Sequence, residues 1–501
     1  MEQLRIRSHG RYGLEVKSRY ILGNGTQDER DENEHRRQQR KRQSYDVGMY
    51  LFFPYSFNVN PSTYPRDTFF EDLKLYLRFD TPGFSVEDLL DESSDTSPLV
   101  RCERMVEEAE QSGNKLPYEP FSYESKILAN VFKSLLRDWY SYLEVLMKEE
   151  DGAEHEASDA QEANEAHESS TGAAPGSGPE NRTGVSEKQL TGEVKRRWNV
   201  VRRFHRLVSR VEAIEGDSRL SAGTRCGEIG EDGGVYILQH TRMIDEHLSL
   251  LLEKYFVLVL EESRKLDLKK AVKRVEKNIL EEMKYRREQG YPSVIEAGCS
   301  ARELENYVYR EKVLKRYAAK VLFNVMKRRN TGKILEHVLY AVAAGIAMLF
   351  ATSIAFLGQT TFGNLSLSLF VLLVASYMLK DRIKDVFREL LLSLLGDRFF
   401  DRSIRLLDPR YGKKLGRIRD HAHFVNEHKV DSSVLKLRNR GAFDRLVGGF
   451  DVESIFHYRK QIRLDGARLY AHHRRIRGFA DITIVNLECF LRALAAQKSR
   501  V

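Results

Sequence analysis

Cysteine is scarce in this chain, and the short motifs of metal, nucleotide and acyl-transfer chemistry are missing. The four cysteines, Cys102, Cys226, Cys299 and Cys489, are too far apart for a CxxC pair or a disulfide framework. The sequence has no HExxH zinc motif, no GxSxG nucleophile elbow and no glycine-rich phosphate loop. We therefore expect a reducing compartment, no cofactor, no metal and no catalytic residue, and we lean against an enzyme.

Histidine and cysteine give no stronger signal elsewhere. His421, His423 and His428 lie close together in the sequence, but no cysteine is nearby and the zinc motifs are absent. Cys489 stands in an apolar run that is typical of a buried structural thiol. Neither feature is predicted to be a functional site.

Charge is absent from the long stretch between Leu339 and Met378. It holds two apolar segments, 335–357 and 362–379, and the neutral residues from Gly358 to Gly363 between them suit a tight turn. A helix rises about 1.5 Å per residue, so the first segment spans a hydrocarbon core of about 30 Å with a modest tilt, and the second is near the lower length limit. The stretch predicts a transmembrane helical hairpin. The alternative is a buried hairpin in a soluble core, which would normally carry a polar face.

Basic residues flank the predicted hairpin, whereas its loop has none. Because basic flanks stay on the cytoplasmic side, we expect a multi-pass protein of the inner (cytoplasmic) membrane with both termini cytoplasmic. The N-terminus lacks the apolar core of a signal peptide, so the hairpin would act as its own insertion signal. The basic residues expected near anionic lipid head groups are Lys327, Arg328, Arg329, Lys333, Lys380, Arg382, Lys384 and Arg388.

Alanine recurs every fourth residue in the first apolar segment, at Ala343, Ala347, Ala351 and Ala355. Small residues at this spacing let helices approach closely in lipid. We interpret this stripe as the surface that packs on the second helix of the same chain, and a homodimer interface is the alternative. No Asp, Glu, Lys or Arg lies mid-membrane, which argues against a transporter but leaves an oligomeric channel open.

The rest of the sequence predicts a mainly α protein with a cytoplasmic helical bundle and a small α+β region built from N- and C-terminal strands. Helical periodicity marks 121–148, 186–213 and 236–289, whereas Glu149 to Val185 is acidic and poor in large apolar side chains, as in a disordered linker. The predicted organisation is an N-terminal α+β region at 1–120, a bundle helix at 121–148, the linker at 149–185, a bundle at 186–330, the transmembrane hairpin at 335–379, a juxtamembrane amphipathic helix at 380–410 and a β-rich region at 411–501.

Apolar stripes predict which faces of the bundle helices are buried. In the first helix the predicted stripe is Ile127, Val131, Leu135, Tyr142 and Leu146. In the second it is Trp198, Val201, Phe204 or His205, Val208 and Val211, opposite Arg196, Arg197, Arg202, Arg203 and Arg206. We interpret these arginines as a solvated face, with apposition to anionic lipid as the alternative. Spacing from Leu268 to Met283 is typical of coiled-coil packing, and a last helix from Ser300 to Met326 would run into the membrane.

Alternation predicts strands at both ends of the chain. Near the N-terminus these are 11–22 and 45–59, followed by a short helix at 67–79 that turns Phe70, Leu73 and Leu77 inward. Near the C-terminus the alternating runs are 430–438, 454–466, 467–477 and 480–491, with Asp465-Gly466 as a hairpin turn. We hypothesise that the strands from the two ends pair in one domain.

Three stretches carry a resemblance. They are DVGMYLFFPYSFNVN…TYPRDTFFEDLKLYLRFDTP before the hairpin, MLKDRIKDVFRE just after it and IFHYRKQIRLDG near the end. Together they cover about a sixth of the chain and are similar to uncharacterised bacterial membrane proteins with two spans. The resemblance implies a membrane location, and it brings no catalytic residue because that group has no assigned activity.

These patterns favour a membrane-anchored scaffold or signal-relay protein that binds the lipid bilayer, anionic head groups and a cytoplasmic protein. The alternatives are a membrane-tethered enzyme acting on a cytoplasmic or lipid substrate and a subunit of an oligomeric channel. Nucleic acid is not an expected partner, because the basic run from Arg36 to Arg42 has no interleaved aromatic side chain to stack on bases.

Overall fold

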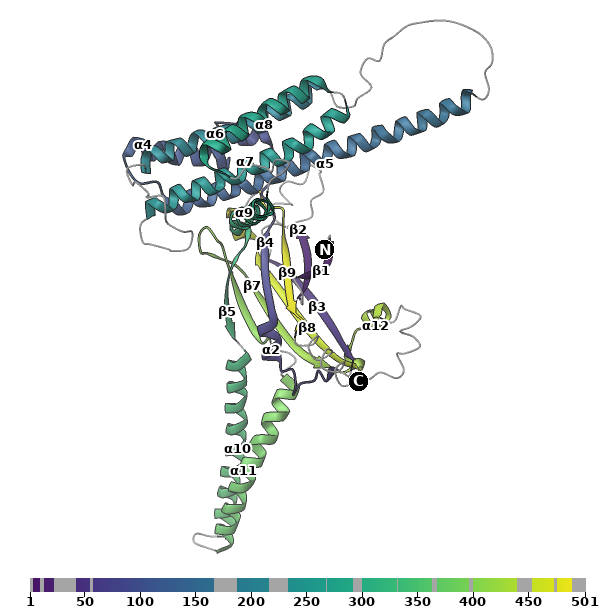
Figure 1. Ribbon diagram of the computed structural model, residues 1–501. Helices are drawn as coiled ribbons and strands as arrows, with labels where there is room; N and C mark the ends of the chain where they lie inside the picture. Colours follow the sequence, from purple (N-terminus) through teal and green to yellow (C-terminus); the bar gives the residue numbers. More distant parts are fainter. Residues whose placement is uncertain are drawn as a thin grey trace, which may run out of the picture. The chain divides into compact units, whose positions relative to one another are not determined.

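The computed structural model describes residues 3–9, 13–21, 42–54, 57–165, 187–215, 233–266, 268–291, 300–330, 332–362, 367–395, 400–438, 453–472 and 475–488. They belong to two compact units (Figure 1). The helical unit comprises 79–323 with 475–477, and the sheet unit comprises 1–78, 324–474 and 478–501. The described chain is mainly α-helical with an α+β part, as the sequence predicts.

The helical unit is a bundle whose core follows the predicted apolar stripes. Trp198, Val201, Phe204, Val208 and Val211 are all buried, as predicted from their spacing. The helices are α3 (Val86–Leu90), α4 (Pro98–Ser112), α5 (Tyr118–Glu165), α6 (Glu187–Glu215), α7 (Gly233–Lys265), α8 (Lys269–Gln289) and α9 (Ala301–Ala319), followed by the 3-10 turn η3 (Lys320–Leu322).

Several expectations for this unit are wrong. Helix α5 continues to Glu165, so the first part of the predicted linker is helical, and the rest from residue 166 lies outside the described residues. The reason is that Glu and Ala, which cannot form a core, still have high intrinsic helix propensity. Tyr142 was expected in the core but is 62% exposed. The periodic run 236–289 is divided between α7 and α8, and coiled-coil packing from Leu268 to Met283 stays a prediction.

The sheet unit combines strands from both ends of the chain. One sheet has the order β1 (Gln3–His9), β2 (Gly13–Ile21), β9 (Gly478–Asn486), β4 (Leu73–Phe79). The other has the order β3 (Arg42–Pro54), β8 (Glu453–Asp465), β7 (Lys414–Val425), β6 (Arg402–Leu407), β5 (Val325–Asn330). Antiparallel pairing of β2 with β9 and of β3 with β8 confirms the hypothesis that both termini share a domain.

The two sheets face each other across a core that contains a buried ion pair. Alternate residues of β4 and β8 are buried, including Leu77, Phe456 and Ile462. Between the sheets, Lys460 Nζ lies 2.5 Å from Asp481 Oδ2 and donates a hydrogen bond of 2.7 Å to Thr483 Oγ1. The outward face of the second sheet therefore carries the intervening residues of its strands.

Short helices replace some of the predicted strands. The helix expected at 67–79 is α2 (Arg66–Asp72) followed directly by β4, because Leu73 to Phe79 alternate with period two. The strands expected at 430–438 and 467–477 are instead the helices α12 (Ser432–Arg438) and α14 (Gly466–His472). Aspartates explain both starts, since Asp431 accepts from the backbone N–H of Ser433 and Asp465 from that of Arg468. Asp465-Gly466 is therefore a strand-to-helix junction and not a hairpin turn.

Candidate membrane-binding site

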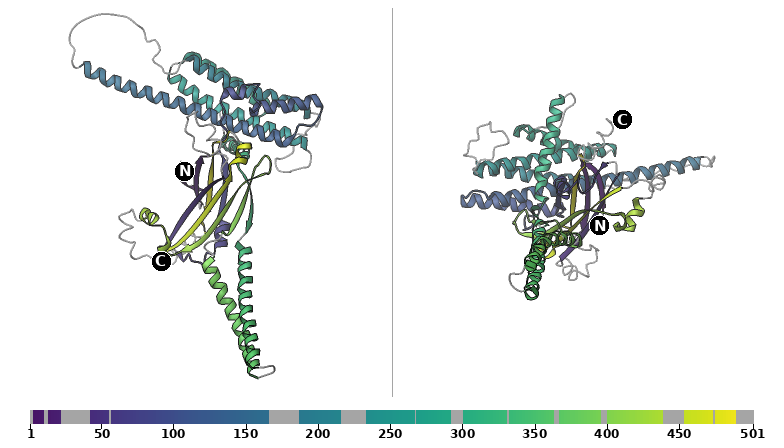
Figure 2. Two further views of the ribbon diagram at one scale, coloured as in Figure 1. Left: turned by 180° about the vertical axis from the view of Figure 1, so that it is seen from behind. Right: turned by 90° about the horizontal axis from the view of Figure 1, so that it is seen from below.

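Two long helices leave the sheet unit between neighbouring strands. Strand β5 leads into α10 (Gly332–Phe362), and α11 (Leu367–Leu395) leads back to β6. Because β5 and β6 pair antiparallel, with Lys327 opposite Arg405, the two ends of this α10–α11 hairpin are held side by side. The helices run alongside each other away from the strands (Figure 1; Figure 2).

The surface of α10 is apolar on nearly every side. In the described part of the chain it is the one helix long and apolar enough to cross a membrane, over His337–Thr361. Only 17% of the most apolar window is buried, whereas the core helix of a soluble domain would be mostly buried. Large apolar side chains stand exposed along both helices, among them Met348, Leu349, Phe356, Leu357, Phe370, Val371 and Met378.

Small residues form the contact between α10 and α11. Ala343 and Ala347 are fully buried, whereas Ala351 and Ala355 are half-buried. Ser376 Oγ lies 3.5 Å from the carbonyl oxygen of Ala351 on the other helix. The first two alanines therefore lie in the packing surface within one chain.

The first half of the predicted turn is helical. Gly358 lies inside α10, which runs to Phe362, and Gly363, the other glycine of the predicted turn, lies outside the described residues. A Cβ atom on Gly358 would lie 2.7 Å from Leu372 Cδ2 of α11. The glycine thus serves close helix packing rather than chain reversal.

The predicted basic flank is divided between helix and strand. On α11, Lys380 Nζ lies 3.9 Å from the ring centroid of Tyr377 and Arg388 Cζ lies 4.0 Å from that of Tyr340, while Arg382 and Lys384 are exposed. Before the hairpin, Lys327, Arg328 and Arg329 lie on β5 and not on a helix that enters the membrane. Lys333 lies in the first turn of α10, and its side chain is outside the described part of the structure.

The regions on either side of the hairpin also differ from expectation. The helix predicted to run from Ser300 to Met326 ends at Ala319, and β5 intervenes before α10. The amphipathic helix predicted at 380–410 is the second half of α11, which ends at Leu395, and β6 begins at Arg402. Strand pairing between β5 and β6 overrides the helical pattern at both places.

The outward face of the second sheet carries a row of four cations. Sequence reasoning named Lys327 as a juxtamembrane residue but did not predict its alignment with the other three. Lys327, Arg405, Arg417 and Arg463 stand opposite one another on β5, β6, β7 and β8, and we call them the basic row. Among the described side chains, no carboxylate forms an ion pair with any of them. Partial burial, and then the nearby Arg417 and Arg463, lower the pKa of Arg419 beside the row. The alternation of basic residues in 414–425 was the available signal.

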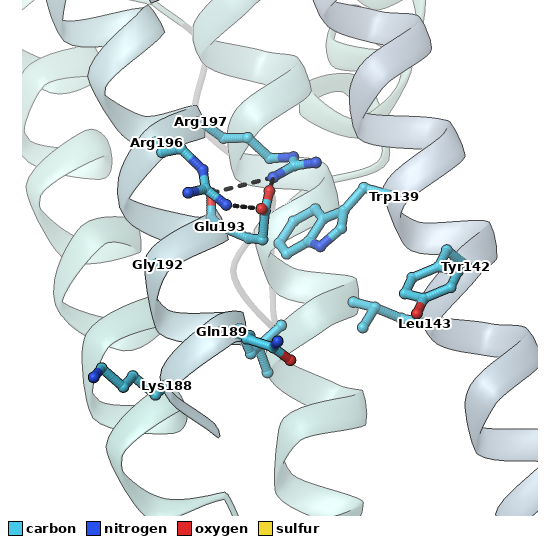
Figure 3. A pocket seen from close by; sticks show the side chains of 10 residues that line it. Trp139, Tyr142, Leu143, Lys188, Gln189, Gly192, Glu193, Arg196 and Arg197 are labelled. Atoms are coloured by element: carbon cyan, nitrogen blue, oxygen red, sulfur yellow. Dashed lines mark hydrogen bonds and ion pairs between the residues drawn. The ribbon is translucent and has the colours of Figure 1, made fainter. Parts of the chain in front are cut away.

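A pocket of about 730 Å³ opens between α5 and α6 of the helical unit (Figure 3). Arg197 stacks over Trp139, with Cζ 4.2 Å from the ring centroid, and Glu193 pairs with both Arg196 and Arg197. Arg197 is 6% exposed, so its place on a solvated face is a wrong prediction. Burial, followed by the charge of Arg196, lowers its pKa to about 10. Glu193 compensates much of the positive charge here.

A second polar cluster of the helical unit is buried between α6, α7 and α8. His205 Nδ1 lies 2.7 Å from Asp245 Oδ1, and His205 Nε2 lies 3.2 Å from Glu282 Oε1. Tyr285 and Tyr291 both donate to Asp245 Oδ2, at 2.8 and 3.0 Å. Every polar atom of the Asp245 carboxylate is thus engaged, which is typical of a structural network.

The histidines considered in the sequence lie on the sheet unit. His421 and His423 stand on β7, and His421 Nδ1 lies 2.9 Å from Asp401 Oδ2. His428 follows in a 3-10 turn, η5 (Glu427–Lys429). In the ranges that the structure describes, no three His, Cys, Asp or Glu side chains are placed to hold a metal ion. Cys489 lies outside the described residues.

Comparison of the sequence with protein-family models and with curated proteins, and of the fold with solved structures, finds no match. The resemblance to two-span bacterial membrane proteins therefore stays a prediction. The structure itself shows an apolar hairpin between two paired strands, and a sheet with a basic outward face on the same unit.

Proposed function

We propose that this chain is a membrane-anchored scaffold or signal-relay protein whose α10–α11 hairpin is its anchor. The observation that carries the proposal is the apolar surface of α10, which is left exposed in a 25-residue span. Exposed apolar surface of this extent is unfavourable in water and marks a membrane or partner interface. Packing of Ala343 and Ala347 on α11 supports insertion as a unit.

Strand pairing supports one side of the membrane for both ends of the hairpin. Residues on β5 and β6 face each other in one ladder, so the chain enters and leaves the anchor at one place. Lys380, Arg382, Lys384 and Arg388 follow the apolar part of α11, and basic residues at this position favour the cytoplasmic face. We therefore place the sheet unit and both termini in the cytoplasm, at the inner membrane.

The basic row supports the scaffold role. Four aligned cations that pair with no carboxylate in the described ranges repel one another, and an anionic partner would relieve that repulsion. An acidic surface of a cytoplasmic protein has the required charge and size.

Membrane fractionation tests the anchor. We expect the full chain to stay with membranes after an alkaline wash and to be released by detergent. A variant with Leu349→Glu, Phe356→Glu and Phe370→Glu should move to the soluble fraction, because each carboxylate opposes insertion by about 3 kcal/mol. A matched variant, Leu4→Glu with Ile6→Glu, adds carboxylates at exposed residues of β1 and should stay membrane-bound. Wild-type protein in the alkaline supernatant would refute the proposal.

A further inference from the structure

Contacts along the hairpin fix the register of its two helices. Near the tip, Gly358 packs against Leu372, and further back Ser376 lies against Ala351. At the base, Arg388 donates a hydrogen bond of 3.0 Å to Tyr340 Oη. Since all three contacts agree on one antiparallel alignment, Lys380 is level with Ala347, one helical turn from the Ser376–Ala351 contact.

This register makes the shared apolar part of the hairpin short. On α11 the uncharged described part runs from Leu367 to Leu379, which is 13 residues or about 20 Å of helix. A hydrocarbon core is about 30 Å thick and needs about 20 residues of helix. The apolar tip that both helices share is therefore too short to cross a bilayer.

Acidic residues prevent deeper insertion. Asp381, Asp385 and Glu389 are exposed on α11 and lie at the level of Tyr340 to Ala347 on α10. Long Lys and Arg side chains can extend to the head groups, but short carboxylates cannot. If all of His337–Thr361 entered the hydrocarbon, each of these carboxylates would enter with it at a large free-energy penalty.

We propose that the hairpin enters the membrane as a wedge and does not cross it. On this view, which rests on the proposed membrane anchor, the helical ends at 347–362 and 367–379 lie among the acyl chains and do not reach the far side. The charged half of α11, and the part of α10 that lies beside it, are among the head groups. Exposed Val338, Val342 and Val386 then contact the interface rather than the hydrocarbon centre.

Cysteine labelling at the tip distinguishes the wedge from a two-span anchor. Thr360 is exposed near the end of α10, and Thr360→Cys is made in the full chain in sealed vesicles of known orientation. A membrane-impermeant maleimide is added to either side, and labelled peptides are identified by mass spectrometry. Ser432→Cys, at an exposed residue of α12, is the control for the side that holds the sheet unit.

We expect the cysteine at position 360 to react from neither side until detergent dissolves the bilayer. Reaction from the side opposite to the position-432 control would overturn the wedge and keep the membrane anchor. Reaction from the same side as that control, without detergent, would overturn both the wedge and the anchor.

Disulfide formation tests the register itself in the membrane. The pair Ala351→Cys with Ser376→Cys should cross-link on mild oxidation, since the two residues contact each other. The matched pair Ala343→Cys with Ser376→Cys should not, because its first residue lies two helical turns away. Cross-linking of the matched pair would overturn the wedge, since a shift of two turns places Lys380 level with Leu339, and the apolar part of α10 could then insert without the carboxylates of α11. Cross-linking of neither pair would overturn it as well, because the contact that sets the register would be missing. Each single variant controls for the native cysteines.

Discussion

At the scale of single residues, His205 shows how the helical unit tolerates buried carboxylates. Burial lowers the pKa of this imidazole, but hydrogen bonds and charge from Asp245 and Glu282 outweigh it and raise the pKa from 6.5 to about 9. Tyr285 stacks on the ring at 3.7 Å between centroids. The histidine is therefore a buried cation that links α6 to α7 and α8.

The first prediction is a loss of stability at alkaline pH. Because the folded pKa of His205 lies above the unfolded one, its stabilisation is complete below about pH 6.5 and is lost as pH rises through about 9. A shift of this size corresponds to about 3 kcal/mol. Both tryptophans, Trp139 and Trp198, lie in the helical unit, so their fluorescence during urea unfolding reports on it. His205→Gln should remove this pH dependence, and a wild-type midpoint constant between pH 6 and 9.5 would contradict us.

The second prediction concerns the ion pair between the sheets. Lys460→Met leaves the carboxylate of Asp481 buried without its cation, and we expect a loss of about 3–5 kcal/mol of folding free energy. The double variant Lys460→Met with Asp481→Leu should recover most of that loss, because no charge is then buried alone. Hydrogen exchange of β8 and β9 measures both effects. Equal damage in the single and double variants would show that packing, not charge, is decisive.

At the scale of elements, the third prediction is that the basic row opposes folding. Arg417→Gln should stabilise the sheet unit at low salt by about 0.2–1 kcal/mol, because like charges directly opposite one another repel. The gain should shrink as salt screens the row. Arg459→Gln is the matched control, since Arg459 NH2 lies 3.9 Å from Asp46 Oδ1. Thermal unfolding, followed by amide hydrogen exchange of β7, measures the stability of the sheet unit. Lower stability of the Arg417→Gln variant than of the wild type at low salt would contradict the prediction.

Among the helices and strands, the sequence predicted the long helices better than the short helices and the strands. Long helices such as α6 were predicted well because their apolar residues recur over many turns. Helices α12 and α14 are seven residues each and were mistaken for strands, since an aspartate cap outweighs alternation over so short a run. Strand β6 was expected to be part of a helix, and β7 was included in the predicted β-rich region but not recognised as a strand, because its alternating residues are basic rather than apolar.

At the scale of the whole molecule, the sheet unit is assembled from segments far apart in sequence. Among the described strands, β2 pairs with β1 and β9, and β3 pairs with β8. The helical unit has its own core, and the C-terminal segment adds Arg475, which donates to Asp88 Oδ2 at 2.9 Å. The two units therefore depend differently on the C-terminal part of the chain.

The fourth prediction follows from this assembly. A chain truncated after Asn330 loses β6 to β9, so β1 to β3 should exchange their amide hydrogens at unfolded rates. The helical unit should keep its tryptophan emission and most of its urea midpoint, because α4 to α9 remain. Mass spectrometry of hydrogen exchange measures both units in one sample. Protected N-terminal strands in the truncated chain would contradict the pairing.

The sequence by itself determined the features that depend on near neighbours. These are the uncharged apolar stretch, the helical periodicity of the bundle and the strands at both termini. Only the tertiary structure decided that β5 pairs with β6 across the hairpin, that four cations from four strands align, and that the carboxylates of α11 lie beside apolar α10. The physical reason is that local patterns arise from contacts within a few residues. Strand and helix register instead arises from contacts between distant segments, which composition and spacing do not specify.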